Sequence, residues 1–367
     1  MFDHASFLTV AGALKLRERL ADWIDVADRP VAILAEPEIG ETVETALGET
    51  ANHLSITSNV AALAEKYKGG PAPLLLCASA QDEPALVERT NAALPGATVH
   101  GLGRDILFAL SLGLKGPDVL SEALKQPLPH QKYAVLCTAR SGSTYFCHLL
   151  QNTGRLGHPT EHLRPPVIFL LAHRHVFGRC LGDWLDGLLR IGSPGGVFGT
   201  KVIDEFVDGL LPHLTADDHA ALERLTDETL FIHYVRRDRA AQAVSQFMAD
   251  QTSVWHLRDE GRRARYAAKK AAIAYDGPAI KAAHDRFSAN DARYQRFLTG
   301  RAKPSLTMVY EDVMADPNRA VDTVTRFILG NSARAPEAEH TRYFQMRDEQ
   351  NAAFATRFRA DYKLDEV

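Results

Sequence analysis

Short apolar runs alternate with amphipathic stretches in the first third of the chain. Residues 30–35, 53–57 and 73–78 have the length and composition of buried strands, and the segments between them repeat apolar residues at helical spacing. This alternation is typical of βα units built around a mostly parallel sheet. Residues 1–125 are therefore predicted to form a smaller α/β (Rossmann-like) N-terminal domain, whose role the sequence does not reveal.

The second part of the chain repeats this pattern after a proline-containing stretch, residues 116–129. That stretch predicts a linker, because proline cannot donate a backbone hydrogen bond. Further strands, each before a helical pattern, are predicted at 133–138, 197–203, 230–235 and 306–310. One helix start is well marked, with Asp316 as the cap and Pro317 at the first helical position. Residues 126–367 should therefore hold a central parallel sheet flanked by helices.

A small polar loop follows the first strand of this second domain. It reads Thr138-Ala139-Arg140-Ser141-Gly142-Ser143-Thr144 and leads into a helical pattern, where backbone N–H groups and the helix dipole favour an anion. Gly142 would let the backbone approach a phosphate. Hydroxyl donors would come from Ser141, Ser143 and Thr144, and a positive charge from Arg140. The loop predicts a phosphate site, although small residues also suit a plain strand-to-helix turn.

Two other loop types fit this segment poorly. The Walker pattern G-x-x-x-x-G-K-[ST] is missing, which argues against a kinase-like site for a nucleotide triphosphate. The pattern G-x-S-x-G does not occur around Ser141, Ser143 or Ser193, so a nucleophilic serine hydrolase is poorly supported.

A second cluster of positive charge lies about 90 residues further on. The predicted strand at 230–235 runs into Arg236-Arg237-Asp238-Arg239, and a helical pattern continues to Ser245. Cations near a helix N-terminus oppose the helix dipole. A solvated basic helix start is the plain explanation, and a second bound phosphate is the functional one.

Together, these segments resemble the trehalose 2-sulfotransferase and lipopolysaccharide sulfotransferase type of bacterial carbohydrate sulfotransferase, over roughly residues 131–360. The segment Ala249-Asp250-Gln251-Thr252-Ser253-Val254-Trp255 adds to the likeness. The resemblance implies a P-loop-like sulfotransferase domain that uses PAPS (3'-phosphoadenosine 5'-phosphosulfate) as co-substrate, without a metal. It also implies that residues 138–144 hold the 5'-phosphosulfate, and that Ser245 and either Arg236 or Arg237 hold the 3'-phosphate.

The same resemblance implies a hydroxyl of a carbohydrate or glycolipid as the acceptor and Glu161 as the general base. A hydroxyl is a poor nucleophile until a base takes its proton, and Glu161 would do this as the hydroxyl attacks sulfur in line with the leaving phosphate. Arg140, the loop amides and Lys201 would stabilise charge on that phosphate. Lys201 could equally be a surface lysine at the end of a strand.

The segment around this glutamate also fits another pattern. His158-Pro159-Thr160-Glu161-His162 matches H-x-x-E-H, which is typical of a class of zinc hydrolases. That site needs both histidines on one helical face, and Pro159 makes His158 at best a helix cap. No third ligand stands out, so no metal is predicted. A nucleotide-dependent phosphotransferase and a non-catalytic nucleotide-binding protein stay open as alternatives.

The composition bears on the kind of partner and on the cellular compartment, and not on the reaction. The net charge of -4 does not suit a nucleic-acid binder. The four cysteines show no C-x-x-C spacing and the N-terminus lacks a signal-peptide pattern, so a cytoplasmic protein is expected. A homodimer and peripheral membrane contact through the acceptor are left open. A basic stretch is typical of a solvated face but could attract anionic lipid or glycan: Arg258, Arg262, Arg263, Arg265, Lys269 and Lys270.

Overall fold

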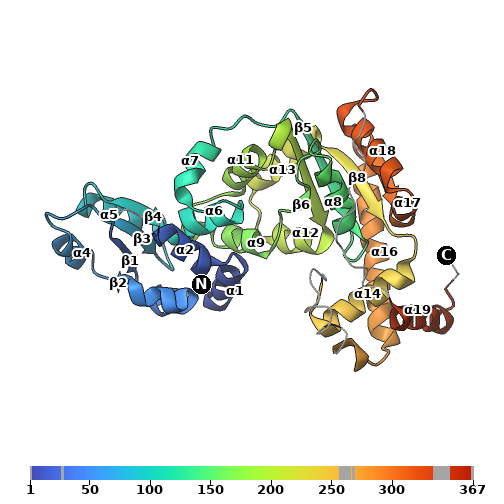
Figure 1. Ribbon diagram of the computed structural model, residues 1–367, viewed down its shortest axis with the longest axis horizontal. Helices are drawn as coiled ribbons and strands as arrows, with labels where there is room; N and C mark the ends of the chain where they lie inside the picture. The colour runs from blue at the N-terminus through green and yellow to red at the C-terminus, as the bar shows by residue number, and fades with distance from the viewer. Residues whose placement is uncertain (1, 26–28, 256–265, 267–268, 334–347, 365–367) are drawn as a thin grey trace. The chain divides into compact units, whose positions relative to one another are not determined.

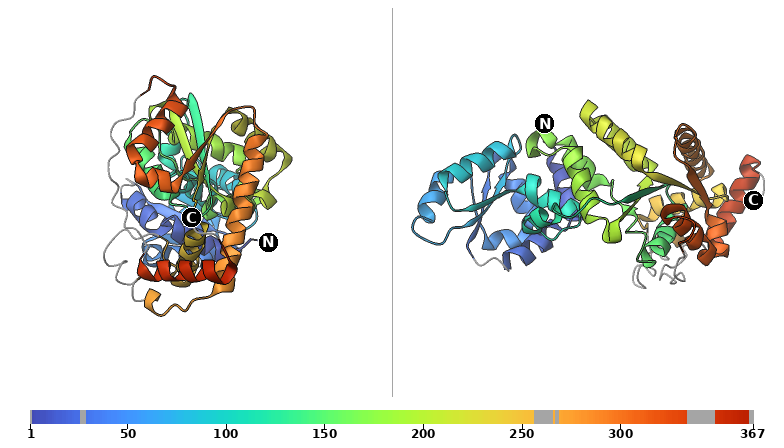
Figure 2. Two further views of the ribbon diagram at one scale, coloured as in Figure 1. Left: turned by 90° about the vertical axis from the view of Figure 1, so that its right-hand side faces the viewer. Right: turned by 90° about the horizontal axis from the view of Figure 1, so that it is seen from above.

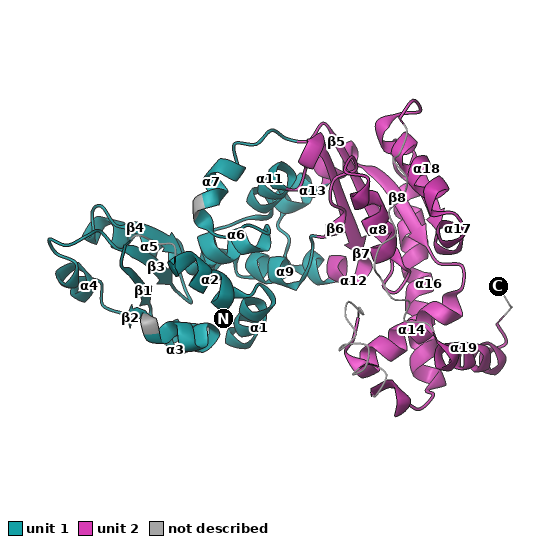
Figure 3. Ribbon diagram, viewed as in Figure 1, with its two compact units in different colours: residues 1–128, 162–191, 209–222 teal, residues 129–161, 192–208, 223–367 magenta. Residues whose placement is uncertain are grey.

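The computed structural model describes residues 2–25, 29–255, 266, 269–333 and 348–364. They form two compact units, each with its own parallel sheet (Figure 3). Unit 1 comprises Met1–Leu128, His162–Ile191 and Gly209–Leu222, and unit 2 comprises Pro129–Glu161, Gly192–Asp208 and Glu223–Val367. Two segments that follow residue 125 in sequence therefore pack with the N-terminal residues. The division of the chain into functional domains at residue 125 stays a prediction.

The sheet of unit 1 has four parallel strands in the order β2-β1-β3-β4. The strands are β1 (Val31–Ala35), β2 (Ser55–Thr57), β3 (Leu74–Ala78) and β4 (Thr98–Gly101). The helices are α1 (His4–Ala13), α2 (Leu16–Asp25), α3 (Pro37–Leu47), η1 (Gly48–His53), α4 (Val60–Lys66), α5 (Glu83–Ala93), η2 (Leu102–Leu107), α6 (Phe108–Ser111), η3 (Pro117–Val119), α7 (Leu120–Ala123), α9 (Pro165–Ala172), α10 (Arg174–Phe177), α11 (Leu181–Ile191) and η5 (Leu211–His213).

Both faces of this first sheet are buried. Ile33 and Leu76 pack in a core that includes residues of α1 and α3, whereas Leu34 and Leu75 pack against α4 and α5. The side chains of a strand alternate between its two faces, so a sheet covered on both sides needs the nearly continuous apolar runs seen in the sequence. Figures 1 and 2 show the strands between these helices.

The sheet of unit 2 has five parallel strands in the order β6-β7-β5-β8-β9. They are β5 (Gln131–Cys137), β6 (Thr160–Glu161), β7 (Val197–Ile203), β8 (Leu230–Val235) and β9 (Ser305–Val309). Because parallel strands all end at the same edge of a sheet, the segments that follow β5, β7, β8 and β9 meet there. The predicted loop follows β5, which is the middle strand.

Helices pack on both faces of this second sheet as well (Figure 1). The helices of unit 2 are α8 (Ser143–Asn152), η4 (Pro194–Gly196), α14 (Arg239–Thr252), α16 (Gly277–Thr299), α17 (Tyr310–Ala315), α18 (Pro317–Leu329) and α19 (Glu349–Tyr362). Two more helices, α12 (Asp204–Leu210) and α13 (Ala216–Glu228), have residues in both units. Val135 and Ile232 pack with α8 and α18, and Leu136 packs with Tyr294 of α16.

The predicted α/β class and the predicted strands are confirmed. β4 and the two-residue β6 were not predicted, because neither has an apolar run long enough to be recognised. The stretch predicted as a linker contains η3 and α7 instead, with Leu120 buried. The start of α18 is confirmed, since the Asp316 side chain accepts the backbone N–H of Arg319.

Three of the four free cysteines, Cys77, Cys137 and Cys147, are buried, and Cys180 is exposed. In the part of the chain that the structure describes, no helix combines the length and apolar character needed to cross a membrane. The arginines of the basic stretch, Arg258 to Arg265, lie outside the described residues.

Candidate active site

The loop at residues 138–142 joins the central strand β5 to α8. Two of its residues have left-handed backbone, Arg140 with φ 57° and Gly142 with φ 87°. Only glycine fits at position 142, because a Cβ atom there would lie 2.4 Å from the ring of Tyr310. A left-handed arginine is strained, so surrounding contacts must hold it in place. Glycine at position 142 and contacts from distant residues therefore fix the shape of this loop.

The start of α8 lacks a side-chain cap, as does the start of α17. The N-cap residue of α8 is Gly142, and no side chain caps its first turn. By contrast, α14, α16, α18 and α19 each begin with an aspartate that accepts a backbone N–H. The buried Oγ of Ser141 also lacks a hydrogen-bond partner among the described residues. Uncapped N–H groups and an unpartnered buried hydroxyl are the groups that an oxygen-rich anion would satisfy.

Two arginines meet at this loop, Arg140 of the loop itself and Arg236 from the segment after β8. Arg140 Nε donates to Oγ of Ser245 at 3.1 Å, and its Nη1 donates to the backbone oxygen of Trp255 at 2.5 Å. Burial lowers the pKa of Arg140, but a guanidinium keeps its charge in proteins. Arg236 lies over the ring of Tyr310, 4.9 Å from its centre, and donates to the backbone oxygen of Arg140 at 3.2 Å. The predicted residues Arg140, Arg236 and Ser245 are thus brought together.

Lys201 connects the candidate base to the start of α8. Glu161 on β6 and Lys201 on β7 are neighbours in the register of the sheet. Lys201 Nζ lies 2.6 Å from Oε1 of Glu161 and 2.9 Å from Oγ1 of Thr144. The lysine side chain is only 5% exposed, so the surface-lysine alternative is wrong. Burial opposes its charge, but the charge of Glu161 and its hydrogen bond to the lysine favour the protonated form, and the pKa of Lys201 is raised above its ordinary value.

The zinc-hydrolase alternative does not match the local backbone. Glu161 lies in strand β6 and His158 lies in irregular structure, whereas H-x-x-E-H requires a helix to place its histidines on one face. Within the described ranges, no three histidine, cysteine, aspartate or glutamate side chains are grouped as metal ligands.

The two consecutive arginines after β8 have different surroundings. Arg236 is 9% exposed and contacts the loop, as described above. The Arg237 side chain is 52% exposed and pairs with Asp312 at 3.0 Å, and exposed pairs of this kind are weak. The backbone N–H of Arg237 donates to Oε2 of Glu311 at 2.9 Å. Arg237 therefore points into solvent beside the loop-binding arginine rather than into the loop.

Sequence reasoning missed two side chains that shape the loop. Gln242 is fully buried, and its Nε2 donates to Oγ1 of Thr138 at 2.8 Å and to the backbone oxygen of Ala139 at 2.6 Å. Tyr310 directly follows β9 and fills the space that a side chain at Gly142 would take. The signal for Tyr310 was its place at the carboxyl end of a predicted strand, and the signal for Gln242 was its helical spacing from Arg239.

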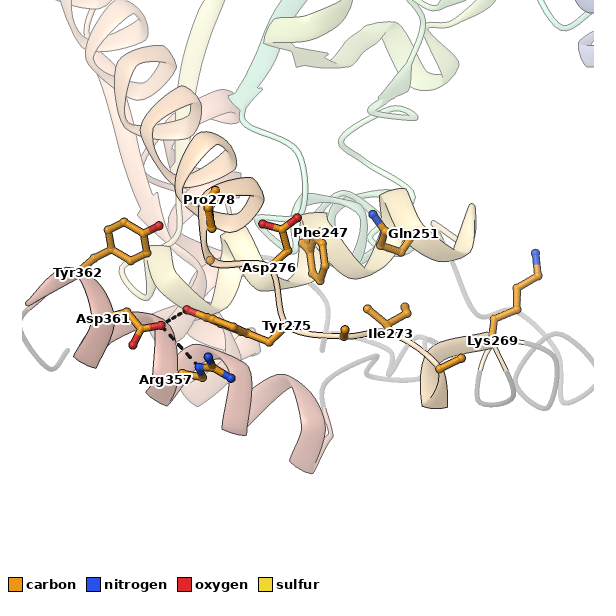
Figure 4. A pocket seen from close by; sticks show the side chains of 13 residues that line it. Phe247, Gln251, Lys269, Ile273, Tyr275, Asp276, Pro278, Arg357, Asp361 and Tyr362 are labelled. Carbon is orange, nitrogen blue, oxygen red and sulfur yellow. Dashed lines mark hydrogen bonds and ion pairs between the residues drawn. The ribbon is translucent and has the colours of Figure 1, made fainter.

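A separate pocket of about 960 Å³ lies beside the C-terminal half of α14 (Figure 4). It is lined by Phe247, Tyr275 and Arg357 among others, and none of the predicted site residues lines it. Three of its polar side chains contact one another: the Tyr275 hydroxyl donates to Asp361 at 2.8 Å, and the Arg357 guanidinium lies 4.1 Å from the centre of the Tyr275 ring. The candidate chemistry is therefore gathered at the loop rather than in this pocket.

Comparison with known proteins identifies the family. The family model for Stf0 sulphotransferases matches residues 132–361, which is more than half of the chain and includes the loop, Glu161, Lys201 and Ser245. The chain belongs to the Stf0 sulfotransferase family. The predicted resemblance is thereby confirmed, and family membership supports sulfuryl transfer as the reaction of this sulfotransferase.

The sulfotransferase also has a similar solved structure, the sulfotransferase domain from the olefin synthase of Synechococcus PCC 7002. The two share 19% sequence identity with a TM-score of 0.33, and the match covers 64% of this chain and 90% of that domain. No curated protein gave a significant match.

Proposed function

We propose that this sulfotransferase transfers the sulfuryl group of PAPS to a hydroxyl of a carbohydrate or glycolipid. The observation that supports this most directly is the position of Lys201, whose Nζ contacts both Glu161 and Thr144 within 3 Å. One buried cation thus links a candidate proton acceptor to the loop that would hold the donor. An acceptor hydroxyl between these two groups would have its proton acceptor and its sulfuryl donor on opposite sides.

The fit of PAPS depends on the hydrogen-bond donors and the positive charge gathered at the loop. The uncapped start of α8, the Ser141 hydroxyl and Arg140 suit a 5'-phosphosulfate. For the 3'-phosphate we assign Arg237 together with Ser245, because the exposed pair of Arg237 with Asp312 costs little to exchange. Arg236 would instead support the loop through the backbone oxygen of Arg140.

Glu161 would act as the base on the acceptor side. Its side chain is 31% exposed, so an acceptor can reach it. The acceptor oxygen forms a bond to sulfur, the bond between sulfur and the 5'-phosphate oxygen breaks, and the hydroxyl proton passes to Glu161. Once Glu161 is protonated, Lys201 is left to stabilise the charge that develops on the leaving phosphate.

Binding measurements without metal ions test the donor. In calorimetry, 3',5'-adenosine bisphosphate should bind more tightly than ADP or 5'-AMP. Arg237→Ala should weaken bisphosphate binding about 10- to 100-fold, because hydrogen bonds to charged groups contribute about 1.5–3 kcal/mol. Arg326→Ala is the matched control, since Arg326 is equally exposed and pairs with Asp322. Equal binding of all three nucleotides by the wild type would exclude PAPS as the donor.

Turnover measurements test the base. Transfer of labelled sulfate from PAPS to trehalose, glucose and an octyl glucoside should be lowered about 10²- to 10⁴-fold in kcat by Glu161→Gln, the usual range for losing a general base. Bisphosphate affinity should stay at the wild-type value. Unchanged turnover in this variant would exclude Glu161 as the base, and turnover that needs ATP and a divalent metal would favour a phosphotransferase.

A further inference from the structure

A hydrogen-bonded series of one half-buried and two buried polar side chains, Arg239 with Asp291 and Gln242, connects α16 to the loop after β5. Asp291 of α16 accepts a hydrogen bond from Nη2 of Arg239, at the start of α14. Nη1 of the same arginine donates to Oε1 of Gln242 at 2.6 Å, and Gln242 Nε2 donates to the loop. Asp291 and Gln242 are both buried. An ion pair that is largely removed from water adds little net stability, so its contacts with the loop are the more informative feature.

The order of donors and acceptors along this series fixes how Gln242 is turned. A guanidinium can only donate, so Arg239 must hold the carboxamide oxygen of Gln242. The carboxamide nitrogen is then left facing the loop, where its two hydrogens meet Thr138 Oγ1 and the backbone oxygen of Ala139. Asp291 in turn fixes Arg239, because a charge-assisted hydrogen bond holds a planar guanidinium in one orientation.

The contacts made by this series affect the sign of charge that the loop presents. Gln242 binds the backbone oxygen of Ala139, and Arg236 binds the backbone oxygen of Arg140. Two successive carbonyl groups, which would repel an anion, are therefore held by side-chain donors. The unpartnered hydroxyl of Ser141 and the uncapped start of α8 follow directly after these two carbonyl groups. The same contacts hold the left-handed backbone of Arg140 in place.

We propose that Asp291, Arg239 and Gln242 are positioning residues for sulfuryl transfer, which act in series to hold the loop in its anion-binding shape. None of the three needs to touch the donor. This inference rests on the proposed function, since it takes the loop to be the site of the 5'-phosphosulfate. It predicts that breaking the hydrogen bonds between these three residues damages the 5'-phosphate site while leaving the 3'-phosphate site intact.

The test uses the full chain with Gln242→Met, Asp291→Asn and the double variant. Gln242→Met keeps length and removes both donors, and we expect kcat with PAPS to fall about 10- to 100-fold, as for misplaced catalytic groups. Asp291→Asn should lower kcat with PAPS about 3- to 10-fold, because it loosens Arg239 without removing Gln242. The double variant should be no worse than Gln242→Met alone, since residues that act in series are not additive.

A pair of nucleotides separates positioning from general damage. In calorimetry, Gln242→Met should weaken the binding of adenosine 5'-phosphosulfate about 10-fold, the loss expected for one or two hydrogen bonds. The affinity for adenosine 3'-monophosphate should stay unchanged. The matched control is Gln246→Met, since Gln246 is also buried in α14 but donates to Asp250 rather than to the loop. It should preserve both affinities and the turnover.

Several results would overturn the inference while leaving the function intact. These are a wild-type rate in Gln242→Met, additive losses in the double variant, or equal losses for the 3'- and 5'-nucleotides. If Gln242→Met does not fold, Asp291→Asn alone tests the inference. A lower kcat with unchanged affinity for adenosine 3'-monophosphate supports the positioning role of the three residues, and an unchanged kcat contradicts it. Failure of the wild type to use PAPS would instead mean that the proposed function is wrong.

Discussion

Each of the two sheets has a serine at the end of a central strand, and the two serines have opposite surroundings. In unit 1, Ser79 follows β3; its hydroxyl donates to Glu36 at 2.5 Å and accepts the backbone N–H groups of Gln81 and Asp82. In unit 2, Ser141 lies in the loop after β5 and its buried hydroxyl has no partner among the described residues. The first hydroxyl makes three hydrogen bonds within the protein, whereas the second makes none among the described residues.

The backbone donors at the two edges differ in the same way. After β4, the buried carboxyl group of Glu83 accepts the N–H groups of Gly103 and Arg104 at 3.1 and 2.7 Å. At the start of α8, no side chain takes this role. A glycine and serine loop at the end of a parallel strand is therefore not sufficient for an anion site. The two edges differ in whether a carboxyl group of the protein accepts the backbone N–H groups, as Glu83 does in unit 1.

The largest effect on turnover is expected from adding a side chain to the loop after β5 in unit 2. Gly142→Ala would force a Cβ atom against Tyr310 at a left-handed residue, and we expect kcat/KM for PAPS to fall about 100-fold or more, because small displacements of catalytic groups are this costly. Gly154→Ala is the control, since Gly154 has φ 65° but no atom within 4 Å of its added Cβ. Equal losses of turnover in both variants would attribute the effect to backbone strain alone.

The next largest effect should appear in how the free energy of unfolding depends on pH, through a buried carboxyl group of unit 1. Burial raises the pKa of Glu83 to about 8, against the lowering effect of the N–H groups of Arg104 and Gly103. A carboxyl group with a raised pKa in the folded state contributes stability that is full below its ordinary pKa, about 4.5, and is lost as the pH rises through about 8. The free energy of unfolding should therefore fall by a few kcal/mol between pH 4.5 and 9, at about 1.4 kcal/mol per pKa unit.

Glu83→Gln should remove this fall, because the amide does not titrate. Urea unfolding followed by tryptophan fluorescence at pH 5 and pH 9 checks this, since Trp23 and Trp184 both lie in unit 1. Glu122→Gln is the control, since Glu122 is an exposed residue of the same unit. A wild-type pH dependence in Glu83→Gln would contradict the assignment of this titration to Glu83.

The smallest effect compares the two serines directly. Ser79→Ala should lower the free energy of unfolding by about 1–3 kcal/mol, because it removes three hydrogen bonds that each contribute about 0.5–1.5 kcal/mol at most. Ser141→Ala should leave that free energy nearly unchanged. It should instead weaken the binding of adenosine 5'-phosphosulfate by about 0.5–1.5 kcal/mol, the net contribution of one hydrogen bond. Denaturation and calorimetry on both variants would show whether the two losses separate. Destabilisation by Ser141→Ala would mean that its hydroxyl already has a structural role.

Local patterns in the sequence were enough to predict most of the framework. Apolar runs identified the longer strands, and the pair Asp316 and Pro317 gave the start of α18, since these features depend on neighbouring residues. The packing of residues 162–191 with unit 1 was not predictable in this way, because it depends on contacts between distant parts of the chain.

The same limit applies to the site. The loop and Glu161 could be proposed from motifs, and the structure brings Glu161 to Lys201, which the sequence could not distinguish from a surface lysine. Gln242 was missed because its partner groups, at Thr138 and Ala139, lie more than 100 residues earlier. Only the three-dimensional fold shows that an ordinary helical glutamine turns its amide toward the loop.

The burial of the cysteines has a practical chemical consequence. Burial raises the pKa of Cys77 and of Cys137 to about 11 and that of Cys147 to about 12, so all three remain neutral thiols near neutral pH. Alkylating reagents attack the thiolate and need access to it. Cys180 is exposed, and it should therefore be the one position that a maleimide modifies in the folded protein. The unaltered sequence thus provides a single attachment point for a fluorescent dye, in unit 1.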